Sequence, residues 1–275
     1  MKFQLKAIAA AVVLAAAVPA QAAVDIGTTG NSSMSLAVFD RAANVSAVFD
    51  LGKSYSDFSV MPAASFADSN VDNVGTNFSW DLTSGDYATA WSTFMSLVNP
   101  ANLQFAVIGS DNAGIGAGSR GLISTLNQEA VTALTTNPLG TQITNWDSYL
   151  GTQQVDLSVI YQNHTAVANG ASVGNAGLGN ATTYFLQNKN NGAGSVSVGN
   201  AGQSLAVYQN LYGSSGFAQT TSTILANNAA FTFTANGQLT YTTNDPVVVV
   251  PEADTWAMML LGLGFMGFAA RRKQA

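Results

Sequence analysis

The chain has 275 residues, a net charge of −6 and no cysteine, which excludes a disulfide framework and thiolate chemistry. Charged residues make up only 9% of it, so asparagine, glutamine, serine, threonine and glycine must cover most of the surface. Between the terminal segments four basic and thirteen acidic residues leave a net charge of −9, which repels phosphate backbones and argues against nucleic-acid binding.

Residues 1–22 have the pattern of a secretory signal peptide. Two lysines precede an unbroken apolar run at 7–18, and Ala20 and Ala22 place small residues at the −3 and −1 positions of a cleavage site before Ala23. The apolar run is short for a membrane span, which favours cleavage over a permanent anchor. We expect export through the Sec translocon and cleavage by signal peptidase.

The exported body, residues 23–246, begins with strand signals. Short β-prone runs on either side of a turn predict a hairpin over 34–51. A helix is predicted over 86–98, ending before Pro100, because apolar residues recur there at i, i+3, i+4 and i+7: Trp91, Phe94, Met95 and Val98. Residues 103–108 predict a buried strand.

The second half of the body alternates weaker helix signals with strands. Residues 122–134 and 143–150 predict helices, and residues 155–161 predict a strand. The clearest hairpin spans 229–243, where Asn236 and Gly237 are typical of a type I′ turn.

A hexapeptide occurs twice in the polar region after residue 162. Residues 172–177 and 197–202 both read Ser-Val-Gly-Asn-Ala-Gly, at an offset of 25 residues. Two copies are too few for a solenoid, so we interpret them as similar strand–turn units. Together these signals favour a mainly β fold, an antiparallel sandwich-like body with two or three helices in the middle.

A glycine motif, G-x-G-x-x-G at residues 116–121, follows a predicted strand and resembles a dinucleotide-binding fingerprint. The glycines begin eight residues after that strand, and no acidic residue lies about twenty residues further on. A Gly-rich loop explains the motif better.

Alternating oxygen ligands at Asp68, Asn70 and Asp72 resemble the start of a calcium loop. The positions of an EF-hand that require glycine and glutamate hold Asn73 and Ser79, so the full motif fails. A surface calcium site drawing on these residues with Asp111 and Asn112 stays open, beside the simpler interpretation as an Asx-turn loop.

No residue is assigned a catalytic, cofactor-binding or metal-binding role. His164 is the only histidine, and the sequence has no G-x-S-x-G motif that would supply a nucleophilic serine for a triad with it. Glu129 is the only glutamate between the two terminal segments, which leaves little for a glycosidase carboxylate pair. Most of the aromatic residues fit a core, although some could form a sugar-stacking platform: Trp80, Trp91, Trp146, Tyr149, Tyr161, Tyr208 and Tyr212.

The tail, residues 247–275, predicts a short transmembrane helix. Residues 256–270 are all apolar or small, which gives a helix about 22 Å long that starts at Trp256. Arg271, Arg272 and Lys273 follow it and would stay on the cytoplasmic side as a stop signal, leaving the body outside.

This tail resembles the PEP-CTERM sorting signal: Pro251 and Glu252, then Asp254 to Met258, a Gly-rich apolar run and a basic end. The third signature position holds Ala253 instead of proline. The resemblance covers about 25 residues and implies processing by exosortase, a membrane protease–transpeptidase, together with exopolysaccharide, biofilm or floc formation.

We therefore expect a non-enzymatic surface or matrix protein, anchored transiently in the inner membrane and then located at the cell surface or in the extracellular matrix. Neutral amides and hydroxyls suit hydrogen bonding to exopolysaccharide. The alternatives are a secreted hydrolase that acts on matrix polysaccharide, and a self-associating structural subunit.

Overall fold

The computed structural model describes residues 23–61, 66–114, 116–127, 135–151, 164–175 and 197–244. Within them, eleven strands form one antiparallel sheet in the order β3-β11-β10-β8-β5-β4-β1-β2-β6, and off this path β7 pairs with β4 and β9 with β8. The strands are β1 Ser33–Asp40, β2 Val45–Ser54, β3 Asn77–Asp81, β4 Gln104–Asp111, β5 Gly121–Leu126, β6 Ser172–Asn175, β7 Gly199–Asn200, β8 Ser204–Leu211, β9 Thr221–Ile224, β10 Ala230–Phe233 and β11 Gln238–Thr242.

Three α-helices accompany the sheet: α2 Tyr55–Phe58, α3 Ala88–Met95 and α4 Thr136–Gly151. Four single 3₁₀ turns complete the described elements: η1 Gly27–Thr29, η2 Gly85–Tyr87, η3 Pro100–Asn102 and η4 Ala168–Gly170. Among the described helices, none has the length and apolar character that crossing a membrane requires. The helix predicted at 256–270 lies outside the described residues.

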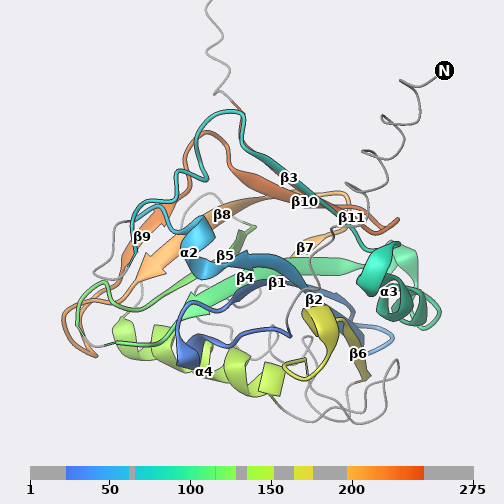
Figure 1. The fold of residues 1–275 in the computed structure, drawn as a ribbon, viewed down its shortest axis with the longest axis horizontal. Coiled ribbons are helices and arrows are strands. Elements are labelled where there is room, and N and C mark those ends of the chain that lie inside the picture. Colours follow the sequence, from blue (N-terminus) through green and yellow to red (C-terminus); the bar gives the residue numbers. More distant parts are fainter. Residues whose placement is uncertain are drawn as a thin grey trace, which may run out of the picture. The chain divides into compact units, whose positions relative to one another are not determined.

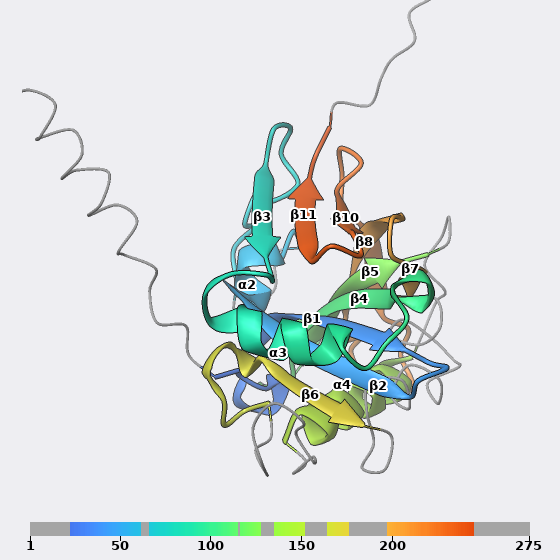
Figure 2. The ribbon, with the colours of Figure 1, turned by 90° about the vertical axis from the view of Figure 1, so that its right-hand side faces the viewer.

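The sheet curls strongly from one end to the other. Figure 2 shows β3, β11 and β10 running upright, whereas β1, β2 and β6 run across the view. The mainly antiparallel β prediction is confirmed. The strands form one continuous curled sheet in place of two stacked sheets, and the curl lets the two ends of the same sheet share a core.

Strands β1, β2, β4 and β5 are buried on both faces. Leu36 and Val38 of β1 point into the main core inside the curl, together with the rings of Phe231 and Phe233. Ala37 and Phe39 point the other way, into a second core that α4 covers. Figure 1 shows α4 running beneath β4 and β1. Burial on both faces explains why these strands read as unbroken apolar runs.

Helix α4 covers the second core through one face. The side chains on that face are fully or almost fully buried: Leu139, Ile143, Trp146, Tyr149 and Leu150. Helix α3 packs into the main core through Trp91 and Phe94, with the ring centre of Trp91 5.9 Å from that of Phe233. The predicted helices at 86–98 and 143–150 are therefore confirmed, the second with a longer N-terminal part than its apolar spacing indicates.

The two predicted hairpins and the strand at 103–108 are also confirmed. In the first hairpin, the Asp40 carboxylate accepts hydrogen bonds from the backbone N–H groups of Ala42 at 2.8 Å and Ala43 at 3.2 Å, which fixes the turn between β1 and β2. In the second hairpin, the predicted type I′ turn is wrong. The Gly237 N–H donates to the Thr234 carbonyl at 3.0 Å, and Gly237 has φ +90°. This places Ala235 and Asn236 at the turn centre, as in a type I turn followed by a bulge glycine.

The helix predicted over 122–134 is wrong for its first residues, because β5 runs through Gly121–Leu126. Leu122 faces the second core and Ile123 the main core, so the run has apolar residues on both faces. A short run buried on both sides cannot be separated from a buried helix by periodicity alone. Residues 128–134 and the strand predicted at 155–161 lie outside the described residues.

Both copies of the hexapeptide contribute a short strand. Ser172–Asn175 forms β6 against β2, and Gly199–Asn200 forms β7 against β4. Both copies thus contain strand as predicted, but it covers four residues in the first copy and two in the second, and Ala176 and Gly177, the turn residues of the first copy, lie outside the described residues. Strand β8, which lies between β10 and β5 inside the sheet, was not predicted. Its side chains Leu205, Val207 and Leu211 are buried.

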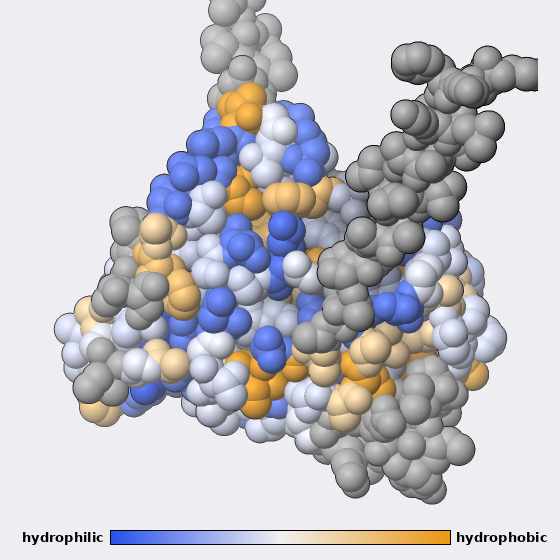
Figure 3. Space-filling view, viewed as in Figure 1, coloured by the Kyte–Doolittle hydropathy of each residue, from blue (hydrophilic) through white to orange (hydrophobic). Residues whose placement is uncertain are grey.

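The described surface is mostly polar. Hydrophilic and weakly polar residues cover most of the face drawn in Figure 3, and hydrophobic ones form small separate patches. The exposed large hydrophobic side chains among the described residues are Val74, Leu97, Phe217 and Ile224. Because charged residues make up only 9% of the chain, most of this polar surface must come from uncharged polar side chains.

Candidate functional site

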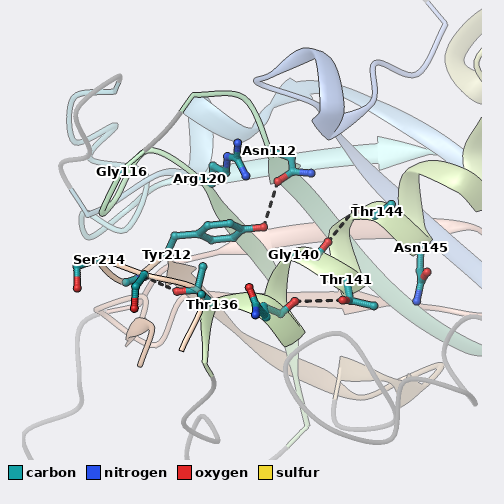
Figure 4. Close-up of a pocket in the computed structure, with 14 residues that line it drawn as sticks. Asn112, Gly116, Arg120, Thr136, Gly140, Thr141, Thr144, Asn145, Tyr212 and Ser214 are labelled. Atoms are coloured by element: carbon teal, nitrogen blue, oxygen red, sulfur yellow. Dashed lines mark hydrogen bonds between the residues drawn. The ribbon is translucent and has the colours of Figure 1, made fainter. Parts of the chain in front are cut away.

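An open pocket of about 550 Å³ lies between α4, the loop that joins β4 to β5, and the loop after β8. Figure 4 shows Arg120, Asn112 and Tyr212 on one side of it, and Thr141, Thr144 and Asn145 of α4 on the other. Its lining consists of Asn112, Gly116, Arg120, Thr136, Asn137, Gly140, Thr141, Thr144, Asn145, Tyr212, Gly213, Ser214, Ser215 and Gly216.

Helix α4 supplies one wall through a polar stripe. Thr136, Gly140 and Thr144 lie four residues apart, and so do Asn137, Thr141 and Asn145, so both rows share one helix face. The opposite face is the apolar one that covers the second core. The amphipathic pattern of one helix therefore positions both the core and this wall.

The loop after β8 is held against the start of α4 by backbone hydrogen bonds. The Thr136 N–H donates to the Ala218 carbonyl and the Asn137 N–H to the Gly216 carbonyl, both at 3.0 Å. The Gly213 N–H in turn donates to Thr136 Oγ1 at 2.9 Å. These bonds pair N–H groups of the first helical turn, which have no partner inside a helix.

Arg120 and Tyr212 form the facing wall. Arg120 Nε donates to the Gly114 carbonyl at 2.6 Å, and its guanidinium carbon lies 5.7 Å from the centre of the Tyr212 ring. The Tyr212 hydroxyl donates to Asn112 Oδ1 at 3.1 Å. Burial raises the pKa of Tyr212, so the phenol stays protonated near neutral pH.

The Tyr212 ring lies very close to the backbone of α4 at Gly140. A Cβ atom at Gly140 would lie 2.6 Å from the Tyr212 hydroxyl oxygen, so only glycine lets the ring come this near to the helix.

The chemistry of the pocket is hydrogen bonding. Its lining, all of it within the described residues, contains threonine, serine and asparagine side chains, one phenol and one guanidinium, and no carboxylate or imidazole. Such a set has no paired acid and base for hydrolysis, because that chemistry needs two titrating groups beside the substrate. It suits recognition of a ligand rich in hydroxyl groups.

The glycine motif at 116–121 forms part of this pocket. It lies in the loop between β4 and β5, which pair antiparallel through Ile108 opposite Ser124 and the residues that follow. An antiparallel pair has no crossover helix, so the motif is not a dinucleotide-binding unit. The interpretation as a Gly-rich loop is the one that fits.

The candidate calcium ligands do not converge. Asp68 accepts the Asn70 N–H at 2.8 Å in an Asx turn, while the Asp72 carboxylate accepts the Ala226 N–H at 2.9 Å. Asp111 accepts the Ala113 N–H at 2.8 Å beside the pocket. Within the described ranges, no group of three histidine or acidic side chains is placed to hold a metal ion.

His164 is buried, with 1% of its surface exposed. Its Nε2 lies 3.2 Å from the Tyr149 hydroxyl of α4, and its Nδ1 is hydrogen-bonded to Ser172 of β6 and to the Gly170 carbonyl. Ser172 is buried as well. The contacts tie β6 to α4. Glu129 lies outside the described residues.

Most of the aromatic residues considered for a sugar platform belong to the cores. Trp91, Trp146 and Tyr208 are buried, and Trp80 packs against the main core. Tyr161 lies outside the described residues. Of the predicted set, Tyr212 alone lines the pocket. The aromatic next to the pocket that sequence reasoning missed is Phe217, whose side chain is 89% exposed.

The cleavage and sorting residues stay predictions, because the structure describes only one of them. Ala23 is the first described residue, and the neighbouring Val24 is buried in the second core. The other residues assigned to the leader and the tail lie outside the described ranges: Ala20, Ala22, Pro251, Glu252, Ala253, Trp256, Arg271, Arg272 and Lys273.

Comparison with known proteins identifies the tail. Residues 249–273 match the PEP-CTERM protein-sorting motif, as the resemblance of the tail indicates. No curated protein and no solved structure matches the chain. The motif marks the chain as an exported protein that exosortase targets.

Proposed function

We propose that this chain, which carries a PEP-CTERM sorting motif at residues 249–273, is a non-enzymatic surface or matrix protein that binds exopolysaccharide after processing at both ends. The sorting motif supports the route. The pocket lining, with its hydroxyls, amides and one guanidinium and without a carboxylate, supports the glycan partner, and it is the observation on which the binding function rests.

The proposed route has two cleavages. Signal peptidase removes residues 1–22 after translocation, and the helix at 256–270 holds the precursor in the inner membrane with Arg271, Arg272 and Lys273 inside. Exosortase then cuts near Pro251 and Glu252. Proline keeps helix from extending upstream, which leaves an extended segment for a protease to accept.

The pocket argues for binding without hydrolysis. A glycosidase places two carboxyl groups about 5–10 Å apart across the scissile bond. The pocket lining offers hydroxyls, amides and one guanidinium instead. The hydroxyls and amides among these groups exchange hydrogen bonds with water for hydrogen bonds with sugar at a small desolvation cost.

Pull-down of the mature protein on exopolysaccharide from the producing cells tests this function. We expect retention of the wild-type protein, and weaker floc formation after deletion of the gene. A protein that binds no matrix polysaccharide, with unchanged flocs in the deletion strain, contradicts the proposal. A glycosidase and esterase screen repeated with His164→Ala and Glu129→Gln separates the hydrolase alternative, because hydrolysis that either variant abolishes would identify an enzyme.

A further inference from the structure

We infer that the pocket binds an acidic oligosaccharide, with Arg120 pairing with a sugar carboxylate and Phe217 contacting the face of a neighbouring ring. This inference rests on the proposed exopolysaccharide function and adds the site and the ligand class.

The charge of the pocket differs from that of its surroundings. The body has a net charge of −9 and only four basic residues: Arg41, Lys53, Arg120 and Lys189. Arg120 is one of these, and it is the charged side chain in the pocket lining; the Asp111 carboxylate, outside the lining, is near enough to attract it. An anionic polymer is repelled by most of the body, so contact is favoured where a guanidinium faces an open cavity.

Arg120 is oriented before any ligand arrives. Its Nε is held by the Gly114 carbonyl, and its plane lies near the Tyr212 ring. A guanidinium has five N–H donors, so the bonds to the Gly114 carbonyl and to the Tyr212 hydroxyl leave donors that can bind a carboxylate. A side chain held in place loses less conformational entropy on binding than a mobile one.

Two threonine hydroxyls of α4 line the pocket as acceptors. Thr141 Oγ1 donates to the Asn137 carbonyl at 3.1 Å, and Thr144 Oγ1 donates to the Gly140 carbonyl at 3.0 Å. A hydroxyl whose proton is used still has lone pairs free to accept. Sugar hydroxyls supply the matching donors, and the sugar carboxylate takes the Arg120 donors.

Phe217 directly follows the lining residue Gly216, in a loop that is anchored on both sides of it. Gly216 before it and Ala218 after it accept the two hydrogen bonds from the first turn of α4. Phe217 is the only aromatic among the exposed large hydrophobic side chains of the described residues. An aromatic ring held in solvent next to hydrogen-bonding groups is suited to contact the apolar C–H face of a sugar ring.

The test measures binding of the purified mature protein to exopolysaccharide extracted from the matrix of the producing cells, both native and after chemical reduction of its carboxyl groups. The variants are Arg120→Gln and Phe217→Ala. Their matched controls are Arg41→Gln, which removes the same charge from the turn between β1 and β2, and Leu97→Ala, which removes another exposed apolar side chain.

We expect Arg120→Gln to weaken binding to the native polymer about tenfold, and Phe217→Ala to weaken it about three- to tenfold. Both controls should stay within about twofold of the wild type. Carboxyl reduction should reproduce the loss seen with Arg120→Gln, and the variant should lose nothing further on the reduced polymer, because both changes remove the same ion pair. Thermal unfolding checks that each variant is folded.

Three outcomes overturn the inference. Equal binding of the native and reduced polymers by the wild type removes the carboxylate from recognition, as does a polymer without acidic sugars. Binding by Arg120→Gln and Phe217→Ala at the control level places the glycan elsewhere on the protein and leaves the proposed function intact. A wild-type protein that binds neither polymer contradicts the proposed function as well.

Discussion

At the scale of single residues, Asp147 joins the start of the described chain to α4. Its carboxylate accepts the backbone N–H of Gly27 at 2.9 Å and that of Thr28 at 2.7 Å, and also the Thr28 hydroxyl. Asp147 and Gly27 are buried, so the Gly27 N–H has little access to water as an alternative partner, whereas Thr28 is exposed. Val24, just before this turn, is buried in the second core. The N-terminal residues are thus an integral part of the fold.

Asp147→Ala should lower the free energy of unfolding by about 2 kcal/mol, because it leaves the buried Gly27 N–H without an acceptor and removes the bonds from Thr28. Urea denaturation of the mature protein measures this as a lower midpoint. Asp68→Ala, which removes an exposed carboxylate that accepts one N–H within its own loop, is the control and should cost about 1 kcal/mol or less. Equal losses in the two variants would contradict the role given to Asp147.

Two buried aspartates respond to pH in opposite directions. Burial raises the pKa of Asp50, against hydrogen bonds from Ser33 and Gly52. Burial also acts to raise the pKa of Asp40, but hydrogen bonds from the N–H groups of Asn99, Ala43 and Ala42 outweigh it and bring that pKa below its usual value. The folded state therefore binds the Asp50 proton more tightly than the unfolded state does, and the Asp40 proton less tightly.

The Asp50→Asn variant should gain stability relative to the wild type as pH rises from about 4 through the raised pKa of Asp50. Over this range the folded wild type must ionise a buried carboxyl group, which costs free energy. The slope of this difference cannot exceed about 1.4 kcal/mol per pH unit for one proton. Asp40→Asn should show the opposite slope below about pH 4, because the wild type gains stability as pH rises from the lowered folded-state pKa to the unfolded-state pKa and is level above it. Urea denaturation between about pH 2 and pH 7 tests both signs, and parallel curves for the two variants would refute the assignment.

At the scale of elements, Gln209 connects β8 to the segment around α2. Its Oε1 accepts the N–H groups of Val60 and Met61, both at 2.9 Å, and its Nε2 donates to the Tyr55 hydroxyl at 2.8 Å and to Ser59 Oγ at 2.9 Å. All four amide positions are paired, and the side chain is fully buried. One polar side chain on a central strand thus fixes a loop that has little regular structure of its own.

Gln209→Leu should cost about 3 kcal/mol in the free energy of unfolding, because it leaves the Val60 and Met61 N–H groups and the Tyr55 hydroxyl without this partner. The control is Gln203→Leu, at an exposed position where the side chain accepts one N–H, from Asn200 at 2.7 Å. We expect a loss of about 1 kcal/mol or less there. Chemical denaturation compares them, and a stability of Gln209→Leu equal to that of the control would contradict the account.

At the scale of the whole molecule, the sorting motif and the body that we propose to bind glycan occupy separate stretches of sequence. The motif occupies residues 249–273, and the described body ends at Asn244. Changes in the motif should therefore alter processing and leave the proposed binding intact.

Replacing Pro251 and Glu252 with alanine should leave the leader cleaved and the tail uncut, because the apolar run and the basic end still stop transfer. The variant should accumulate in the inner membrane with a larger intact mass than the mature wild-type protein. Val247→Ala with Val248→Ala, just outside the matched residues, is the control and should be processed normally. Release of the Pro251 and Glu252 variant at the wild-type rate and mass would show that exosortase does not recognise these residues.

Local signals account for what could be predicted about this protein. Turn residues such as Asp40, and apolar spacing such as that of Trp91 and Phe94, act over a few residues, and the hairpins and helices they predict are present in the structure. The sorting motif is likewise a linear pattern, which is why the sequence alone determines the export class. None of these signals depends on distant parts of the chain.

Only the tertiary structure decided how the strands are joined and where the pocket lies. Leu122 and Ile123 are in a strand because β5 pairs with β4 and β8, and that pairing depends on burial from both faces. The pocket combines the loop around Arg120, the polar face of α4 and the loop after Tyr212, segments that meet because the sheet brings β4, β5 and β8 side by side. The i, i+4, i+8 stripe of Thr136, Gly140 and Thr144 was a visible signal, but the facing wall is set by long-range pairing that no local pattern encodes.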